Sequence, residues 1–270
     1  MKKELRNKVK IELDPKLSVQ DNANVYYSKA KKFRRKLKGI EEAIKLTEKL
    51  IEKEKQREIK EDFLEKKIER KKEWFESFHW FKLNDFLVIG GRDAKSNTRL
   101  VKNYFEEDDL FFHADVTGAS VVIVKKGKQM PEKDLEKVAV FAVSFSRAWK
   151  AGRGVADVYA VEKHQVKTAA KSGEYLSAGS FVIEGKKKLF RNTVLELKIG
   201  FNEEGKLMIA PPSVLKKGVV IKPDLKSTKG NSVKIIFKKL KQLYPDKQFD
   251  INWVQELLPN GGSKVSEVTS

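Results

Sequence analysis

Cysteine is absent from this 270-residue chain, and histidine occurs only three times, at His79, His113 and His164. Without cysteine the chain has no disulfide and no thiolate to serve as a metal ligand or nucleophile. Three histidines also leave little for a metal site built from imidazoles. We therefore expect neither a metal nor a cofactor.

Long apolar runs are also missing. No stretch of about 18 apolar residues occurs, as a membrane-spanning helix would need. The first six residues, Met-Lys-Lys-Glu-Leu-Arg, lack the apolar segment of a signal peptide. The sequence thus predicts a soluble, cytoplasmic protein that does not bind membranes.

Acidic residues are outnumbered: 57 Lys and Arg stand against 38 Asp and Glu, which leaves a net charge of +19. Basic surfaces bind phosphate backbones and release counterions, so the excess favours a nucleic acid as partner. The alternative is that the charge serves solubility alone.

Proline is absent between Pro15 and Pro131, and within that span residues 18–73 show the pattern of one long helix. Apolar residues follow each other at intervals of three and four, as in one seam of a coiled coil. This predicted helix interface comprises Tyr26, Ala30, Phe33, Leu37, Ile40, Ile44 and Ile51. Such a stripe needs a covering helix, from a second chain or a second copy of this one. A hairpin bending at Gly39 is the alternative.

Short apolar runs separated by turns and two or three amphipathic segments occupy residues 74–258. They predict an α+β domain with a mainly antiparallel sheet. A short strand is expected in residues 1–17, where "KVKIEL" alternates polar and apolar residues. The tail 259–270 is expected to be disordered.

Two stretches suggest polar sites. In "FHADVTGASVVIV" (112–124), His113 and Asp115 face the same side of a strand and precede a glycine turn and Ser120. Catalysis, ligand contact and a purely structural turn are all open readings. In "VIGGRDAKSN" (88–97), two glycines before a helix allow close approach of a phosphate, which Arg92 could bind. A hairpin turn is the simpler reading.

Basic residues gather in two further stretches that suit a phosphate backbone. "SFSRAWKAGRG" (144–154) places Arg147, Lys150 and Arg153 around Trp149, which we expect in the core. "HQVKTAAKSGEYLSAGSFVIEGKKK" (164–188) interleaves lysines with an aromatic that could stack on a base. Its candidate residues are Lys167, Lys171, Tyr175, Lys186, Lys187 and Lys188.

These stretches, in this order and together with "EWFESFHWF" (73–81), resemble the RNA-binding (NFACT-R) domain of the NFACT family, the NEMF and RqcH type of ribosome quality-control proteins. The resemblance runs from about residue 74 to 192, and residues 9–39 are similar to the returning helix of the family's coiled-coil arm. We expect the amino-terminal NFACT-N half to be missing here, and the chain to be one half of a split NFACT protein or an excised piece.

The resemblance implies a non-catalytic subunit that binds tRNA and rRNA on large ribosomal subunits obstructed by peptidyl-tRNA. Its partners would be that subunit, tRNA and a second chain with the NFACT-N half and outgoing helix, or a second copy. The family's polar positions in the predicted RNA site fall on Arg92, Asp93, Asn97, His113, Asp115, Ser120, Gln165 and Tyr175.

Two other functions remain open at this stage. A nucleic-acid-processing enzyme could use His113 and Asp115, with Asp93 or Glu174 as a further acid. A scaffold or adhesion protein is the other alternative, and the basic charge disfavours it.

Overall fold

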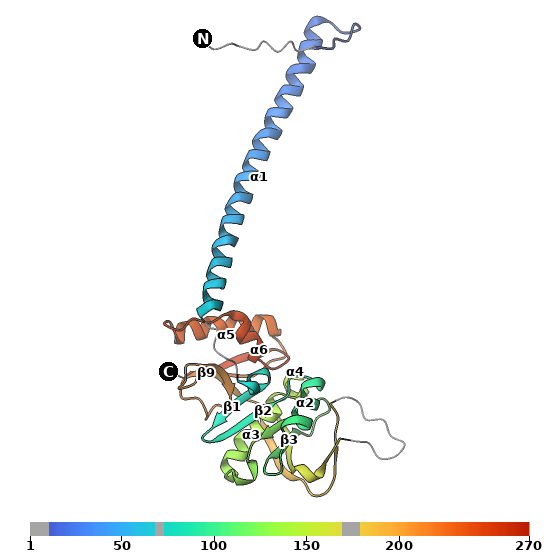
Figure 1. Cartoon of the computed structure of the whole chain (residues 1–270). Helices are drawn as coiled ribbons and strands as arrows, with labels where there is room; N and C mark the ends of the chain where they lie inside the picture. Colours follow the sequence, from blue (N-terminus) through green and yellow to red (C-terminus); the bar gives the residue numbers. More distant parts are fainter. Residues whose placement is uncertain (1–10, 68–72, 169–178, 270) are drawn as a thin grey trace, which may run out of the picture. The chain divides into compact units, whose positions relative to one another are not determined.

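A computed structural model describes residues 11–67, 73–168 and 179–269, without the side chains of residue 53 and residues 55–67. The chain divides into two compact units, Met1–Lys71 and Lys72–Ser270, which are described separately (Figure 1). Candidate residues Lys171 and Tyr175 lie outside the described residues.

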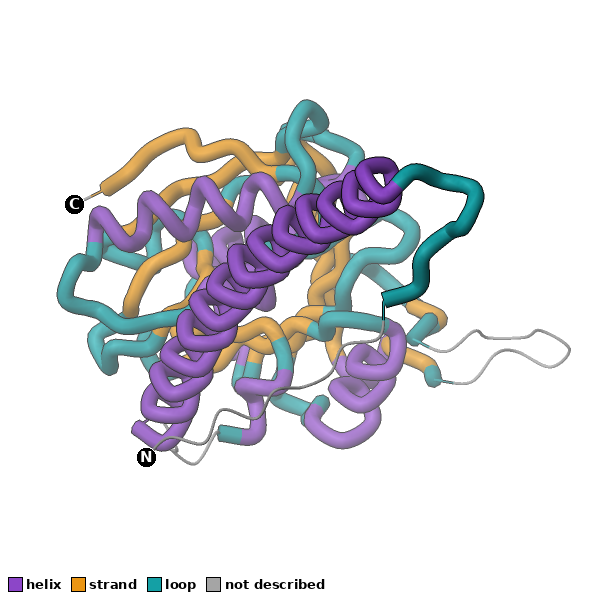
Figure 2. The backbone as a smooth tube through the Cα atoms, turned by 90° about the horizontal axis from the view of Figure 1, so that it is seen from above, coloured by secondary structure: helices purple, strands orange, loops and turns teal. Residues whose placement is uncertain are grey.

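The first unit is dominated by helix α1 (Val19–Lys67), a single helix of 49 residues. It runs through Gly39 without a break (Figure 2), and a Cβ added at Gly39 would meet no atom within 4 Å. The continuous helix is therefore confirmed, and the hairpin reading is wrong. No proline interrupts the hydrogen-bond ladder, and one glycine is too small a penalty to bend it.

A short loop precedes α1 and folds back onto its first turns. The Ser18 hydroxyl accepts the Asp21 N–H at 3.1 Å, which caps the helix. The Asn22 amide bonds back to Asp14, and the Tyr26 hydroxyl donates to the Glu12 carbonyl at 2.7 Å. Residues 11–14 form no strand, so the strand expected in "KVKIEL" is wrong for its last three residues, and residues 8–10 lie outside the described part. The loop is held by these side chains instead of by a neighbouring strand.

The second unit is an α+β domain, as the sequence predicts. Its helices are α2 (Ala94–Tyr104), α3 (Glu132–Ser144), α4 (Arg147–Lys150), α5 (Lys229–Leu243) and α6 (Ile251–Leu257), with 3-10 helices η1 (Trp74–Ser77), η2 (Gly127–Gln129) and η3 (Lys163–Gln165). Its strands are β1 (His79–Leu83), β2 (Phe86–Gly90), β3 (Leu110–Ala114), β4 (Val122–Val124), β5 (Val155–Glu162), β6 (Val166–Lys167), β7 (Val182–Ile183), β8 (Lys188–Val194), β9 (Leu197–Phe201), β10 (Leu207–Ala210), β11 (Gly218–Pro223) and β12 (Ser263–Thr269).

Strands pair antiparallel throughout the described residues. The larger sheet has the order β1-β2-β4-β3-β5-β8, the second has β10-β9-β11-β12, and β6 and β7 form a small hairpin-like pair. The prediction of a mainly antiparallel fold is confirmed.

Side chains of the larger sheet alternate between two cores. Phe81, Val88 and Phe112 point to the core shared with α3 and the second sheet, while their neighbours Ile89 and Phe111 join α2 and η1 on the other face. This follows from the two-residue period of a strand. Because both faces are covered, the strands carry the continuous apolar runs that marked them in the sequence.

The carboxy-terminal tail is part of the second sheet. Strand β12 (Ser263–Thr269) pairs with β11 along its length, with a register shift between Val220 and Ile221. The expectation of disorder in 259–270 is therefore wrong for residues 263–269. Small and polar residues there suggested a free end, but the unpaired edge of β11 supplies hydrogen-bond partners that local sequence does not reveal.

Candidate functional site

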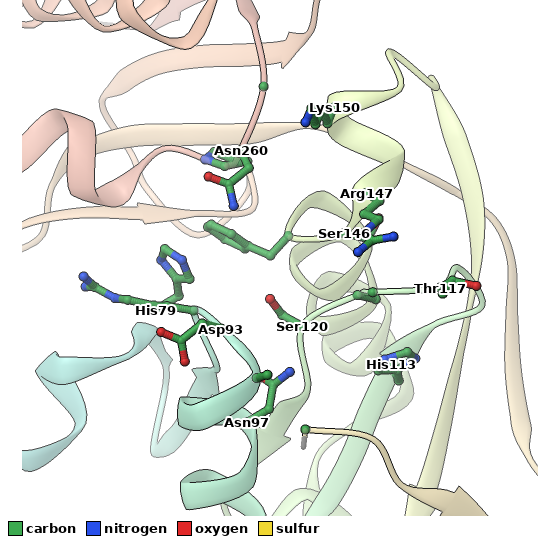
Figure 3. A pocket seen from close by; sticks show the side chains of 18 of the residues that line it. His79, Asp93, Asn97, His113, Thr117, Ser120, Ser146, Arg147, Lys150 and Asn260 are labelled. Atoms are coloured by element: carbon green, nitrogen blue, oxygen red, sulfur yellow. The ribbon is translucent and has the colours of Figure 1, made fainter. Parts of the chain in front are cut away.

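One large cavity lies in the second unit, where several segments that are distant in the sequence converge. Its volume is about 1000 Å³, and it is bordered by the start of α2, the end of β3 with the turn after it, the α3–α4 junction and residues 255–261. Figure 3 shows Ser120 between a side formed by His79 and Asp93 and a side formed by Arg147. Seven predicted site residues line this cavity: Arg92, Asp93, Asn97, His113, Ser120, Arg147 and Lys150.

Asp93 caps helix α2 and is engaged in that role. Its carboxylate accepts the Ser96 N–H at 2.7 Å, and the Ser96 hydroxyl accepts the N–H groups of Arg92 at 2.8 Å and Asp93 at 2.9 Å. The Ser96 backbone N–H, followed by the Ser96 hydroxyl, lowers the pKa of Asp93. Asp93 therefore stabilises the loop that carries Arg92.

Asn97 is buried, and its side chain connects α2 to the residue that precedes β4. Its side-chain oxygen accepts the Val121 N–H at 3.2 Å. Gly91 passes so close that an added Cβ would lie 1.9 Å from this oxygen. Gly91 of "VIGGRDAKSN" thus leaves room for Asn97, and phosphate approach is not required to explain this glycine.

The turn after β3 brings His113 and Gly118 to the cavity. Gly118 has a φ of +74°, and an added Cβ would lie 2.5 Å from Arg147 Nε. The guanidinium therefore packs over a residue that must be glycine for both conformation and space. Asp115 is exposed and does not line the cavity, although it follows His113 by two residues.

His79 is a cavity residue that the sequence reading missed. It begins β1, is 8% exposed, and its ring stacks on Phe145 with centroids 4.0 Å apart. Burial, followed by the charges of Arg92 and Lys229, holds the pKa of His79 well below its ordinary value. The imidazole is therefore neutral near pH 7. A lone histidine before an aromatic run gave no signal, because its neighbours come from distant segments.

Cations from separate elements border the same cavity as this neutral ring. Arg147 and Lys150 are exposed on α4, and Lys229, which the sequence reading also missed, begins α5 and donates to the Leu258 carbonyl at 3.0 Å. Burial, then Arg92, lowers the pKa of Lys229, and burial is the main cause that lowers the pKa of Arg92. Glu256 is the further acid on the cavity wall besides Asp93. The balance of charge at the cavity favours an anionic ligand.

Several predicted contacts lie away from the cavity lining. Gln165 is a structural link, because its amide donates to the Glu184 carbonyl at 3.0 Å and the Lys186 carbonyl at 2.9 Å. Lys187 covers the Tyr159 ring at 4.2 Å, and Lys188 pairs with Glu132. The others are exposed: Asp115, Arg153, Lys167 and Lys186. Trp149 is in the core, as predicted, at 1% exposure.

The described residues contain no group of three or more metal-binding side chains. In the same residues, no helix is long and apolar enough to cross a bilayer. What the cavity offers chemically is hydrogen bonding, positive charge and aromatic surface.

The buried imidazole of His79 gives a pH-dependent stability. Below about pH 6.5 the unfolded chain takes up a proton at this residue, whereas the folded chain keeps the ring neutral, so acid favours unfolding. The contribution of His79 to the free energy of unfolding is fully present above that pH. It is lost below that pH, by up to about 1.4 kcal/mol per pH unit. We expect urea midpoints of His79→Phe to decrease less than those of the native chain between pH 7.5 and pH 5.5. Exposed His164→Phe is the control, and equal decreases in native chain and His79→Phe would contradict the assignment.

The predicted helix interface is exposed on α1. Of its apolar side chains, Phe33, Leu37 and Ile40 are 59%, 58% and 55% exposed. Among the α1 residues whose burial is described, only Asn22 is buried. A stripe of this length leaves apolar surface in water that a second helix would cover.

Two family models match the chain. Residues 71–185 match the NFACT protein RNA binding domain, and residues 1–76 match the NFACT N-terminal and middle domains. The second match corrects part of the expectation that the NFACT-N half is missing, because residues 1–76 themselves match that model. The resemblance placed residues 9–39 in the returning helix of the coiled-coil arm, and this match extends over residues 1–76.

Similar proteins also include members of the NFACT family. The chain is 42% identical over 207 residues to "Archaeal Rqc2 homolog aRqcH" of Methanocaldococcus jannaschii, covering 74% of this chain and 30% of that protein. It is 39% identical over 184 residues to "Ribosome quality control complex subunit NEMF homolog" of Drosophila melanogaster, covering 66% and 18%. It thus spans less than a third of either relative.

Among solved structures, the chain is similar to the C-terminal part of the fibronectin/fibrinogen-binding protein from Streptococcus suis. The TM-score is 0.37 at 19% identity, over 43% of this chain and 45% of that one. The family assignment does not depend on this likeness. On its two family matches and its relatives, the chain belongs to the NFACT family, and residues 71–185 are its RNA-binding domain.

Proposed function

We propose that this chain is the non-catalytic RNA-binding part of a ribosome-associated quality-control factor that works in the cytoplasm on large ribosomal subunits obstructed by peptidyl-tRNA. The observation that carries the proposal is the convergence of Arg92, Arg147, Lys150 and Lys229 on one cavity of a domain with this family assignment. Phosphate groups of tRNA and rRNA are the ligands that such a cluster suits.

The curated relatives support the ribosomal setting by their names, which describe subunits of a ribosome quality control complex. The net charge of +19 supports contact with a polyanion. An enzyme using His113 and Asp115 gains no support, because the acid is exposed outside the cavity and Asp93 is engaged in capping α2.

Binding to tRNA tests this function, and its dependence on salt identifies the phosphate contacts. Each lysine or arginine that neutralises a phosphate contributes about one to the slope of log K against log salt concentration. We expect Arg147→Ala with Lys150→Ala to reduce the slope by about two and to weaken binding roughly tenfold near 0.15 M salt. Fluorescence anisotropy with labelled tRNA and with a large-subunit rRNA fragment measures both.

The matched control removes two exposed lysines on α5, Lys238→Ala with Lys239→Ala, which do not line the cavity. Its slope should change by less than half as much. If native protein bound RNA without dependence on salt, or if both double variants behaved alike, the cavity rim would not be the phosphate-binding surface.

We propose further that α1 pairs with a second helix from the NFACT-N half of a partner chain. The support is the uninterrupted spacing of the predicted helix interface and the exposure of its side chains. Self-association of this chain through the same stripe is the competing arrangement.

A further inference from the structure

Buried polar atoms without a hydrogen-bond partner concentrate in residues that line the cavity. In the described part of the chain, four buried side-chain atoms lack a hydrogen-bond partner: His79 Nδ1, Arg92 Nε, His113 Nδ1 and Ser144 Oγ. The first three belong to residues that line the cavity. Leaving such an atom unpaired costs about 1–3 kcal/mol, so three at one place call for an explanation.

His79 and Arg92 are the clearest cases of buried side chains with an unpaired polar atom. His79 is 8% exposed, and its neutral ring offers one donor and one acceptor. Arg92 uses one terminal nitrogen to donate to the Phe78 carbonyl at 3.2 Å, which leaves Nε without a partner. His113 is the weaker case, because backbone groups of Ala114 and Ala119 already interact with its ring. A ligand with both donors and acceptors would satisfy what the protein leaves open.

The cations at the cavity are placed to hold an anion. Arg92 and Lys229 repel each other, since each is partly buried and Arg92 lowers the pKa of Lys229. In Figure 3, Arg147 lies across Ser120 from His79 and Asp93, and Lys150, on the same helix as Arg147, also borders the cavity. Glu256 offsets one positive charge, while the carboxylate of Asp93 is occupied by Ser96. A phosphate between these groups would relieve the repulsion.

Flat apolar surfaces lie next to these charges. The His79 ring stacks on Phe145, and both residues are 8% exposed. Phe111 and Tyr159 also border the cavity but are buried, whereas Phe181 is partly exposed. Stacking surfaces beside phosphate-binding cations are the features by which proteins hold an unstacked base. The volume of about 1000 Å³ is at the upper end of ordinary ligand pockets, so a single inorganic phosphate would leave most of it empty.

We propose that this cavity receives one nucleotide that is unstacked from the bound RNA, with its base against the His79–Phe145 pair and its phosphate at Arg147, Lys150 and Lys229. The inference rests on the proposed RNA-binding function. The domain would then read a single-stranded or distorted position and not only the charge of the backbone. Nucleotides free in solution would occupy the same place weakly.

Binding of small ligands to the full chain tests this proposal without RNA. Isothermal titration calorimetry is carried out with the four nucleoside 5′-monophosphates, with the nucleosides and with inorganic phosphate. We expect at least one monophosphate to bind at least tenfold more tightly than its nucleoside and than phosphate. Ser120→Tyr, which fills the centre of the cavity, should weaken that binding at least tenfold, whereas Ser213→Tyr at an exposed site outside the lining should not.

A second variant guards against misfolding of the first. His79→Phe keeps a ring against Phe145 and removes the imidazole nitrogens, so we expect it to fold normally and to bind the monophosphate at least fivefold more weakly. Circular dichroism and thermal unfolding of each variant establish that it is folded.

The outcomes separate this inference from the proposed function. If tRNA binds with the expected salt dependence but no monophosphate binds, or if phosphate binds as tightly as the monophosphates, the nucleotide site is wrong and the function stands. The same holds if neither variant alters monophosphate binding. If monophosphates bind but tRNA does not, the cavity is a site for free nucleotides, and both proposals as stated are overturned.

Discussion

Deletion of residues 259–270 should lower the free energy of unfolding of the second unit by at least about 4 kcal/mol. This value takes roughly 1 kcal/mol for each hydrogen bond that strand β12 contributes. Strand β12 pairs with β11 from Gly218 to Pro223, so its removal exposes a ladder of backbone groups and the apolar side chains beneath. The melting temperature should drop by about 10 °C or more for a unit of this size.

A buried chain of hydroxyl groups makes this tail integral to the fold. Trp149 Nε1 donates to Ser263 Oγ at 3.1 Å, and Ser263 N–H donates to Ser232 Oγ at 2.8 Å. Ser232 Oγ also donates to the Ser263 carbonyl at 2.9 Å. The tail therefore links α5 to the core tryptophan near the cavity.

Differential scanning calorimetry of the full chain and the deletion measures the effect. Ser263→Ala should account for about 1–2 kcal/mol of it by leaving the Trp149 N–H unpaired, whereas Glu267→Ala on the exposed face of β12 should leave stability unchanged. A deletion that melts with the full-length protein would show that the tail contributes nothing to the fold, as its composition first suggested.

Loss of the α1 stripe should abolish pairing with the NFACT-N half. We expect Leu37→Gln with Ile44→Gln to weaken the complex at least 100-fold, because burying each of these side chains is worth about 1.5–3 kcal/mol and 1.4 kcal/mol is a factor of ten. The two residues are 7 positions apart on the exposed stripe, so they occupy equivalent heptad positions.

The control carries the same new residue on the opposite face, Arg35→Gln with Glu42→Gln, since glutamine is a good helix former at all four positions. Sedimentation velocity measures this chain alone and mixed with the NFACT-N half of the archaeal relative. A 1:1 complex that survives the control but not the stripe variant is the expected result. A chain that forms a homodimer by itself, and loses it in the stripe variant, would refute the heteromeric pairing and establish self-association.

Sequence patterning determined a good part of the structure. The heptad spacing and the absence of proline predicted α1 as one helix, because periodicity and backbone continuity are local properties. Apolar runs such as 86–89 and 110–112 predicted strands, because a strand buried on both faces is apolar at every position. The family motifs located the RNA-binding domain.

Residues of the candidate cavity were singled out from the sequence only where they stand in local motifs. Arg92, His113 and Arg147 stand in recognisable stretches, and all three line the cavity. Tertiary structure alone brought His79 and Lys229 to the cavity, although they lie 150 positions apart in the sequence and although His79 stands in the family stretch 73–81. It also decided that Asp93 and Gln165 hold backbone groups, since a polar side chain can bond to a ligand or to its own fold with the same sequence around it. Strand β12 shows the same limit, because the edge that orders it belongs to β11, at least forty residues away. Local physics thus set the long helix and the buried apolar strands of this protein, whereas long-range packing set the strand at its carboxy-terminal end and which polar groups are left free to bind.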